Sequence, residues 1–120
     1  MIAKIFDTIK PHYIKSLDFL KHVRTYPCCI GKGCDYRLEV SHTKNPGKGL
    51  KDDGNAVMMC TLHHREFHTG AKTFENHYPG RIEAQRREII TAWVETLTEP
   101  ENEAERAYFE KILEKEFPDA

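Results

Sequence analysis

One short stretch of the sequence concentrates residue types that bind metals. From Cys60 to His68 the chain runs C-T-L-H-H-R-E-F-H, with one cysteine and three of the protein's seven histidines. Thiolate and imidazole are ligands that zinc and its neighbours prefer in proteins. A complete ligand set needs residues from more than one segment, so the remaining ligands must come from elsewhere in the chain.

The other three cysteines lie in the loop C-C-I-G-K-G-C, whose glycines allow the backbone to fold back as a zinc knuckle requires. A second knuckle, C-x-x-H, follows later in the chain. Together they predict a tetrahedral structural zinc site rather than buried cysteines without metal or a disulfide. Its expected ligands are Cys34, Cys60, His63 and either Cys28 or Cys29. The C-x4-C spacing favours Cys29 within that pair.

Composition explains why such a site would matter. The chain has 120 residues, of which 39% are hydrophobic and 31% charged, so it can bury only a thin core. A filled four-ligand zinc site contributes roughly 10–16 kcal/mol of apparent binding energy. Zinc is therefore expected to hold together a single small domain.

The elements that must position these residues form a strand, a strand and a helix. Alternating apolar residues predict a strand over residues 36–42, and an apolar run predicts a second over residues 55–59. A Lys- and Gly-rich loop, residues 43–54, joins them. Thr61 is expected to cap a short helix that Gly70 ends. His64 and His68 then share one helical face, because they are four residues apart.

Helices are expected on both sides of this unit. Ser16 is a plausible N-cap for a helix over residues 16–25, residues 82–97 carry a helical apolar stripe, and residues 1–13 are ambiguous. Residues 71–80 are expected to be a linker. Thr98 and Glu101 have capping-box spacing for a last helix, from about residue 99 to 116. These elements divide the chain into an N-terminal lead-in (1–15), a zinc domain (16–97) and an acidic C-terminal helix or tail (98–120).

Charge and hydropathy restrict the kinds of partner that the protein is expected to bind. Residues 1–97 carry 15 Lys and Arg against 11 Asp and Glu, whereas residues 98–120 carry 3 against 8. A mildly basic body fits a protein that binds nucleic acid. No apolar run is long enough to cross a bilayer, and the first ten residues lack a signal-peptide core. We therefore expect no membrane partner and a cytoplasmic location, where thiols remain reduced.

A second histidine constellation resembles a known family. The constellation consists of His42, Asn55 and His64, which are separated by 12 and 8 residues. His64 comes directly after the C-x-x-H knuckle. This pattern resembles the motif of HNH endonucleases, the ββα-metal or His-Me finger superfamily. The pattern P-C-C…C…V-S-H…G-L-K-D-D…C-T-L-H-H-R-E-F-H-T-G is similar to phage-type members, which include a RecA-dependent recombination nuclease. The resemblance covers roughly residues 16–97. The position after Pro27 favours Cys28 as the zinc ligand.

The resemblance implies roles for individual residues. His42 resembles the general base, and Asn55 resembles the asparagine that braces the loop holding it. His64 and His68 resemble the helix ligands of a catalytic divalent metal (Mg, Mn or Zn), and Asp53 matches a supporting loop aspartate. An imidazole base and one cation are what phosphodiester hydrolysis needs.

One position departs from the family pattern. Ser41 stands where the family commonly has an Asp or His that acts as a third metal ligand. The metal would then depend on the two helix histidines, with water and substrate completing its shell, and its identity and the activity itself stay open. Phosphate contacts are expected from basic residues beside the site, namely Lys44, Lys48, Lys51 and Arg65.

The sequence therefore predicts an α+β fold, a small ββα-metal finger with a structural zinc knuckle and flanking helices. The expected function is metal-dependent hydrolysis of DNA by an HNH endonuclease, in phage or prophage recombination or DNA processing. A recombination protein such as a RecA-type filament is a further expected partner. The alternative is a non-catalytic zinc-stabilised module that binds DNA or a protein.

Overall fold

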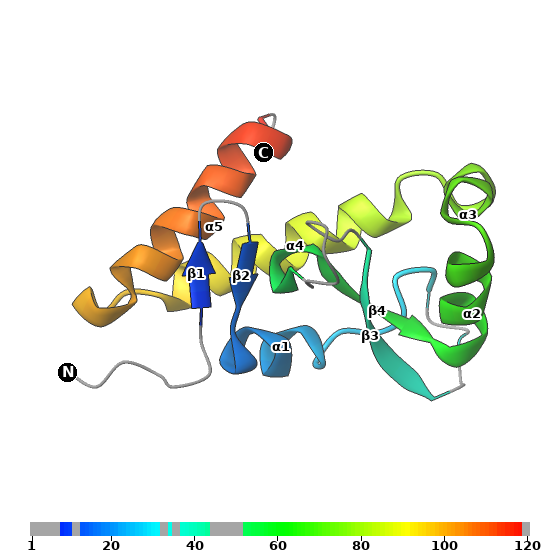
Figure 1. Cartoon of the computed structure of the whole chain (residues 1–120), viewed down its shortest axis with the longest axis horizontal. Coiled ribbons are helices and arrows are strands. Elements are labelled where there is room, and N and C mark those ends of the chain that lie inside the picture. The colour runs from blue at the N-terminus through cyan, green and yellow to red at the C-terminus, as the bar shows by residue number, and fades with distance from the viewer. Residues whose placement is uncertain (1–7, 11–12, 32–33, 35–36, 44–51, 119–120) are drawn as a thin grey trace.

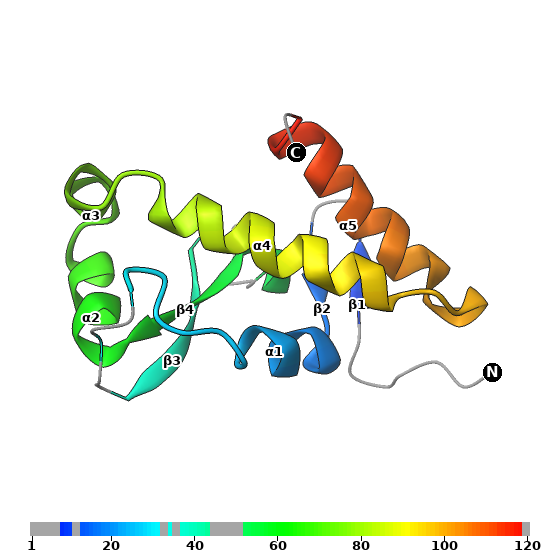
Figure 2. The same ribbon diagram turned by 180° about the vertical axis from the view of Figure 1, so that it is seen from behind.

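One long helix, α4 (Arg81–Thr96), runs between the two ends of the molecule (Figures 1 and 2). The structure is a computed structural model that describes residues 8–10, 13–31, 34, 37–43 and 52–118. It is a small mixed α+β domain with two separate two-stranded sheets. Helix α4 was expected over residues 82–97, and its position is confirmed within one residue at each end.

A strand, a strand and a helix follow one another at the end of the molecule that will carry the site. β3 (Leu38–His42) and β4 (Ala56–Cys60) pair antiparallel, so the predicted hairpin is confirmed. Every residue of β4 is buried. α2 (Thr61–Thr69) begins directly after β4 and ends at Gly70, as expected.

The N-cap of α2 differs from the prediction. Thr61 is already inside the helix, and the cap is Cys60, whose Sγ accepts a hydrogen bond from the backbone N–H of His63 at 3.4 Å. The strand therefore passes into the helix without a loop, and one residue belongs to both elements. This leaves the side chains of α2 in a fixed relation to those of β4.

The remaining part of this end is α3 (Ala71–His77), where a linker was expected. That prediction was wrong. A helix of two turns has little stability of its own, and α3 depends on tertiary packing. Phe74 is fully buried, and its ring lies 5.6 Å from that of Phe67 in α2.

The N-terminal part of the described chain contributes a hairpin and a helix. β1 (Thr8–Lys10) pairs antiparallel with β2 (Tyr13–Lys15), in the segment whose structure was left open. α1 (Leu17–Val23) follows, and the Ser16 side chain caps it by accepting from the N–H of Phe19 at 3.2 Å. The predicted helix and its N-cap are thus confirmed.

The C-terminal helix joins the same core. A 3-10 turn, η2 (Pro100–Asn102), leads into α5 (Glu103–Glu116), and neither element has a side-chain cap, so the expected capping box does not form. Phe109 of α5 is fully buried, with its ring 4.6 Å from that of Phe19 in α1. The acidic segment is therefore packed against residues 16–97 rather than extending from them as a free tail. None of the described helices is long and apolar enough to cross a membrane.

Candidate metal centre and histidine site

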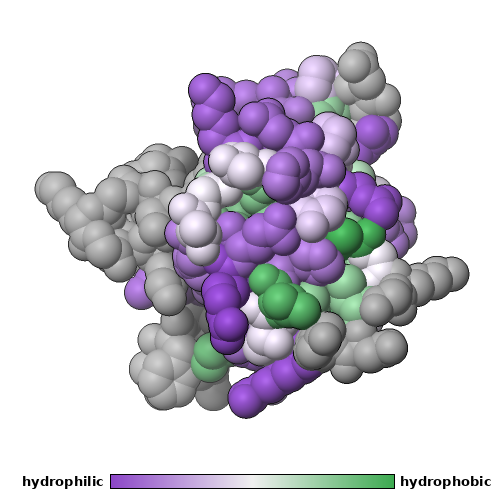
Figure 3. Space-filling view, turned by 90° about the vertical axis from the view of Figure 1, so that its right-hand side faces the viewer, coloured by the Kyte–Doolittle hydropathy of each residue, from purple (hydrophilic) through white to green (hydrophobic). Residues whose placement is uncertain are grey.

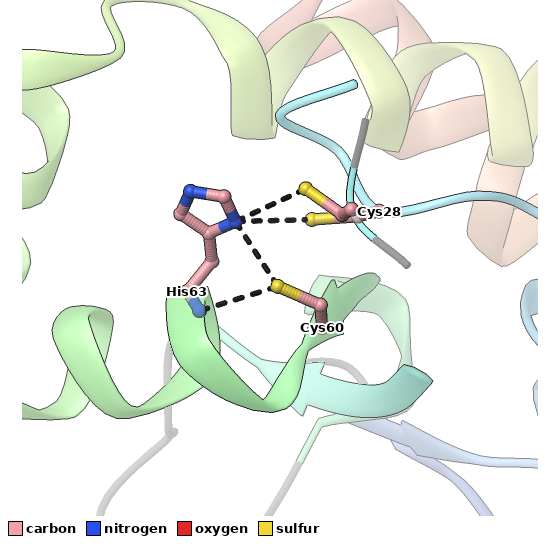
Figure 4. A group of neighbouring side chains, drawn as sticks. Cys28, Cys60 and His63 are labelled. Carbon is pink, nitrogen blue, oxygen red and sulfur yellow. Dashed lines mark hydrogen bonds between the residues drawn. The ribbon is translucent and has the colours of Figure 1, made fainter. Parts of the chain in front are cut away.

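Three cysteines and one histidine converge at the start of α2. The potential ligand atoms of Cys28, Cys34, Cys60 and His63 all lie within 4.8 Å of one another. Nδ1 of His63 lies 3.1 Å from Sγ of Cys60, 3.3 Å from that of Cys34 and 3.6 Å from that of Cys28 (Figure 4). In a tetrahedral zinc site these atoms would be roughly 3.6 Å apart, given bonds of about 2.3 Å to sulfur and about 2.0–2.1 Å to nitrogen. The cluster could therefore hold a metal ion.

Helix α4 positions the loop that carries Cys28. Gln85 donates from Nε2 to the carbonyl of Pro27 at 2.7 Å and accepts at Oε1 from the N–H of Met58 at 2.8 Å. One buried amide thus joins the cysteine loop to β4. After Cys28 the chain turns at Gly31, whose φ of 150° is costly for other residues and whose N–H bonds the Cys28 carbonyl at 3.0 Å.

Helix α3 covers His63. The ring of Tyr78, directly after α3, lies edge-on to the imidazole at 5.3 Å, and that of Phe74 lies edge-on at 6.4 Å. These contacts limit rotation of the His63 ring while its Nδ1 faces the sulfur atoms. The helix that the sequence did not predict is therefore part of the wall of the metal centre.

The protonation of the cluster's thiols depends on whether a cation is bound. Burial, followed by the hydrogen bonds and negative charges of Cys28 and Cys60, raises the pKa of Cys34 to about 12. Crowded thiols without a counter-charge resist forming thiolates, which are the species that bind metals. A divalent cation at their centre reverses this repulsion. Metal binding at this cluster would therefore release protons from the thiols.

The structure selects Cys28 over Cys29. Cys29 donates its N–H to the Met58 carbonyl at 2.8 Å, and its side chain belongs to the hydrophobic core. Burial raises the pKa of Cys29 to about 12, and the neighbouring Cys28 adds to that shift. The C-x4-C preference for Cys29 was therefore wrong, because pairing to β4 turns this residue away from the cluster.

These two adjacent cysteines form a matched pair for a test. Cys28→Ser is expected to lose the bound metal and lower the melting temperature, because hydroxyl oxygen is a poor replacement for thiolate. Cys29→Ser should keep the metal, although a hydroxyl in the core will cost some stability. Metal content per chain by elemental analysis, with thermal unfolding followed by circular dichroism, distinguishes them. Equal metal loss in both variants would contradict the assignment.

A second group of polar residues surrounds His42 at the end of β3. Its Nε2 lies 2.8 Å from Oδ1 of Asp53, and the two side chains are only 16% and 9% exposed. The other Asp53 oxygen accepts from the N–H of Ser16 at 2.7 Å. Because a carboxylate only accepts hydrogen bonds, Asp53 favours the His42 tautomer whose proton is on Nε2 and whose lone pair is on Nδ1.

Asp53 and Asn55 belong to one short turn, η1 (Asp53–Asn55). The Asn55 carbonyl accepts from the N–H and hydroxyl of Thr43, which follows His42, at 3.2 and 2.8 Å. Its side chain donates to Oδ2 of Asp52 at 3.1 Å. Asn55 therefore holds the chain beside His42, while Asp53 contacts the His42 ring itself.

The two helix histidines face each other. Nε2 of His64 lies 2.9 Å from Nε2 of His68, and Nδ1 of His64 lies 2.8 Å from Oε1 of Glu39 in β3. A carboxylate that accepts from Nδ1–H leaves Nε2 free to bind a metal, which is a common arrangement around metal-bound histidine. Among the described residues, however, three or more potential ligands lie close enough to hold a metal ion only in the Cys28 cluster. His64 and His68 do not belong to such a group.

Two further positions bear on this pair. Glu39 was missed from the sequence, although its alternation with Ser41 along the strand could have revealed it. Ser41 lies on the same face of β3, is fully buried, and has an Oγ without a hydrogen-bond partner among the described residues. The side chain at this position is therefore a buried hydroxyl, not the Asp or His that the family pattern commonly has.

Comparisons with protein-family models, curated proteins and solved structures give no match for this chain.

The surface beside the site is mainly hydrophilic. Figure 3 shows the end of the molecule formed by α2 and α3, where a small hydrophobic area interrupts polar residues. Leu62 of α2 and Leu38 of β3 are exposed by 49% and 40%. Arg65 is exposed on α2. The other predicted phosphate contacts fall outside the described residues, namely Lys44, Lys48 and Lys51.

Proposed function

We propose that this chain is a metal-dependent endonuclease of the HNH type, with β3, β4 and α2 as its ββα-metal finger. One observation carries the proposal: a single strand–strand–helix unit holds both an Asp-oriented histidine, His42, and a carboxylate-oriented histidine pair, His64 and His68. The first arrangement suits a general base, and the second suits a divalent metal. Phosphodiester hydrolysis requires both.

Structural zinc is the proposed occupant of the cysteine cluster. Three thiolates and one imidazole form a closed tetrahedral set, which leaves no position for substrate and is typical of structural sites. The cluster joins the Cys28 loop, the end of β4 and the first turn of α2. Its role is to fix the helix that carries His64 and His68.

His42 is the proposed general base. Asp53 accepts the Nε2 proton and keeps the lone pair on Nδ1, which is the atom that would take a proton from water. As the proton arrives, the positive imidazolium is stabilised by the nearby carboxylate. Such proton transfer typically contributes about 10²–10⁴-fold to the rate.

His64 and His68 are the proposed ligands of a catalytic Mg, Mn or Zn ion. Such an ion supplies charge stabilisation for the phosphate and the departing 3′ oxygen. Glu39 orients His64 for this role by accepting from its Nδ1. With only two imidazoles from the protein, affinity for this ion should be weaker than affinity for zinc at the cysteine cluster.

DNA is the proposed substrate, bound through its phosphates with little reading of bases. Arg65 lies one residue after His64 and is exposed, and it is the proposed phosphate contact. The phage or prophage role in recombination and a RecA-type partner rest on the family resemblance alone.

Plasmid nicking tests this function. Wild-type protein is expected to nick supercoiled DNA when Mg²⁺, Mn²⁺ or Zn²⁺ is added, and His42→Ala should lower the rate by about 10²-fold or more. His77→Ala is the matched control, because His77 lies at the end of α3 with its side chain 61% exposed. Its rate should equal that of wild type. Nicking that survives in His42→Ala would contradict the assignment of the base.

The second candidate is a zinc-stabilised module that binds DNA or a protein without catalysis. Ser41 favours it, since this residue offers no good ligand at the face of β3 shared with Glu39. A protein that retains DNA affinity, binds one zinc per chain and cleaves nothing in any of the three metals would support this candidate over the nuclease.

A further inference from the structure

A buried arginine of α4, Arg86, forms a hydrogen bond to the turn that carries Asp53. Nε of Arg86 in α4 donates to the Gly54 carbonyl at 2.8 Å, and this side chain is only 2% exposed. Its two terminal nitrogens donate to both carboxylate oxygens of Glu116 at 2.7 and 3.2 Å. A guanidinium held bidentately has a fixed plane, so Glu116 sets the direction in which Arg86 points at the turn.

Glu116 is one of three residues of α5 that contact this turn, its cap Asp52 or Arg86. Tyr108, Ile112 and Glu116 are spaced by four residues and share one helical face. The Tyr108 hydroxyl lies 3.5 Å from both Asp52 oxygens, and a Cβ added to Gly54 would lie 3.3 Å from Ile112. The C-terminal helix therefore covers the turn directly as well as through Arg86.

Any displacement of the turn is passed to His42. Gly54 is covalently between Asp53, which contacts the His42 ring, and Asn55, which bonds Thr43. Without Glu116, Arg86 retains Glu83 on its own helix, now 3.7 Å away. The guanidinium would then turn toward Glu83, and its hydrogen bond to the Gly54 carbonyl would weaken.

We propose that Glu116 is a positioning residue that acts through Arg86 and the turn at Gly54 to fix the orientation and tautomer of His42. The C-terminal helix is thereby a functional part of the site, although it is far from His42 in the sequence. The effect on catalysis rests on the proposed nuclease function, whereas the effect on the His42 ring does not.

The test compares Glu116→Ala with Glu114→Ala, since Glu114 is exposed on the same helix. Nitrogen-15 NMR of the histidine rings should show wild-type His42 protonated at Nε2 and a mixture of tautomers in Glu116→Ala. Plasmid nicking should show a kcat lower by roughly 10- to 100-fold, with KM unchanged. Glu114→Ala should match wild type in both measurements.

Glu116→Gln is a second variant that keeps the test decisive if Glu116→Ala does not fold. It keeps the size of the side chain but loses its charge and one acceptor oxygen, so changes between those of wild type and Glu116→Ala are expected. A folded Glu116→Ala or Glu116→Gln with an unchanged His42 tautomer would overturn the inference. If wild type does not nick DNA, the proposed function fails, and the NMR comparison still decides the role of Glu116.

Discussion

Replacing His63 by alanine is expected to unfold the metal-binding end of the protein, whereas replacing the adjacent His64 should leave it folded and inactive. His63 supplies the only nitrogen of the Cys28 cluster. A structural zinc site contributes roughly 10–16 kcal/mol in apparent binding energy, which is of the same order as the roughly 5–15 kcal/mol that stabilises most domains. His64, by contrast, contacts Glu39 and His68 and takes no part in that cluster.

Zinc content, circular dichroism and nicking rate measure the difference. His63→Ala should bind less than one zinc per chain and melt at a much lower temperature. His64→Ala should match wild type in both respects and lose cleavage. A strong chelator should unfold the wild-type protein, and added zinc should refold it. If the two variants behaved alike, the separation into a structural centre and a catalytic pair would be wrong.

Phe109→Ala is expected to lower the free energy of unfolding by about 3–5 kcal/mol, the usual cost of truncating a buried phenylalanine. The side chain is fully buried against Phe19. Deleting residues 99–120 should have a larger effect and prevent stable folding, because it also removes Glu105, which accepts from Trp93 Nε1 at 2.6 Å, and Glu116.

Urea unfolding gives the free energies for this comparison. Lys111→Ala is the control on the same helix, since Lys111 is exposed and should change stability little. A truncated chain with the urea midpoint of the full-length protein would show that α5 is dispensable after all.

Local patterns in the sequence were sufficient for the central unit. Ser16 caps α1 because an N-cap needs only its own side chain and the N–H three residues later. The strand at residues 38–42 follows from alternation, and the knuckle follows from the spacing of Cys60 and His63. Each of these features depends on residues that are near one another in the chain.

Features that depend on distant residues were missed. α3 is too short to be stable alone and exists because Phe74 packs in the core. The choice between Cys28 and Cys29 depended on which one pairs with Met58 of β4. The Glu39 contact with His64 joins residues 25 positions apart, and the Arg86 contact with Gly54 joins residues 32 positions apart.

The absence of a loop between β4 and α2 restricts how this protein can vary in length. Cys60 is at once the last residue of the strand, the cap of the helix and a member of the metal cluster. One inserted residue at this junction would rotate the helix by about 100° relative to the strand. His63 would then leave the cluster, and His64 would turn away from Glu39 in the same step. An insertion at this junction would therefore disrupt the metal cluster and the contact between His64 and Glu39 together.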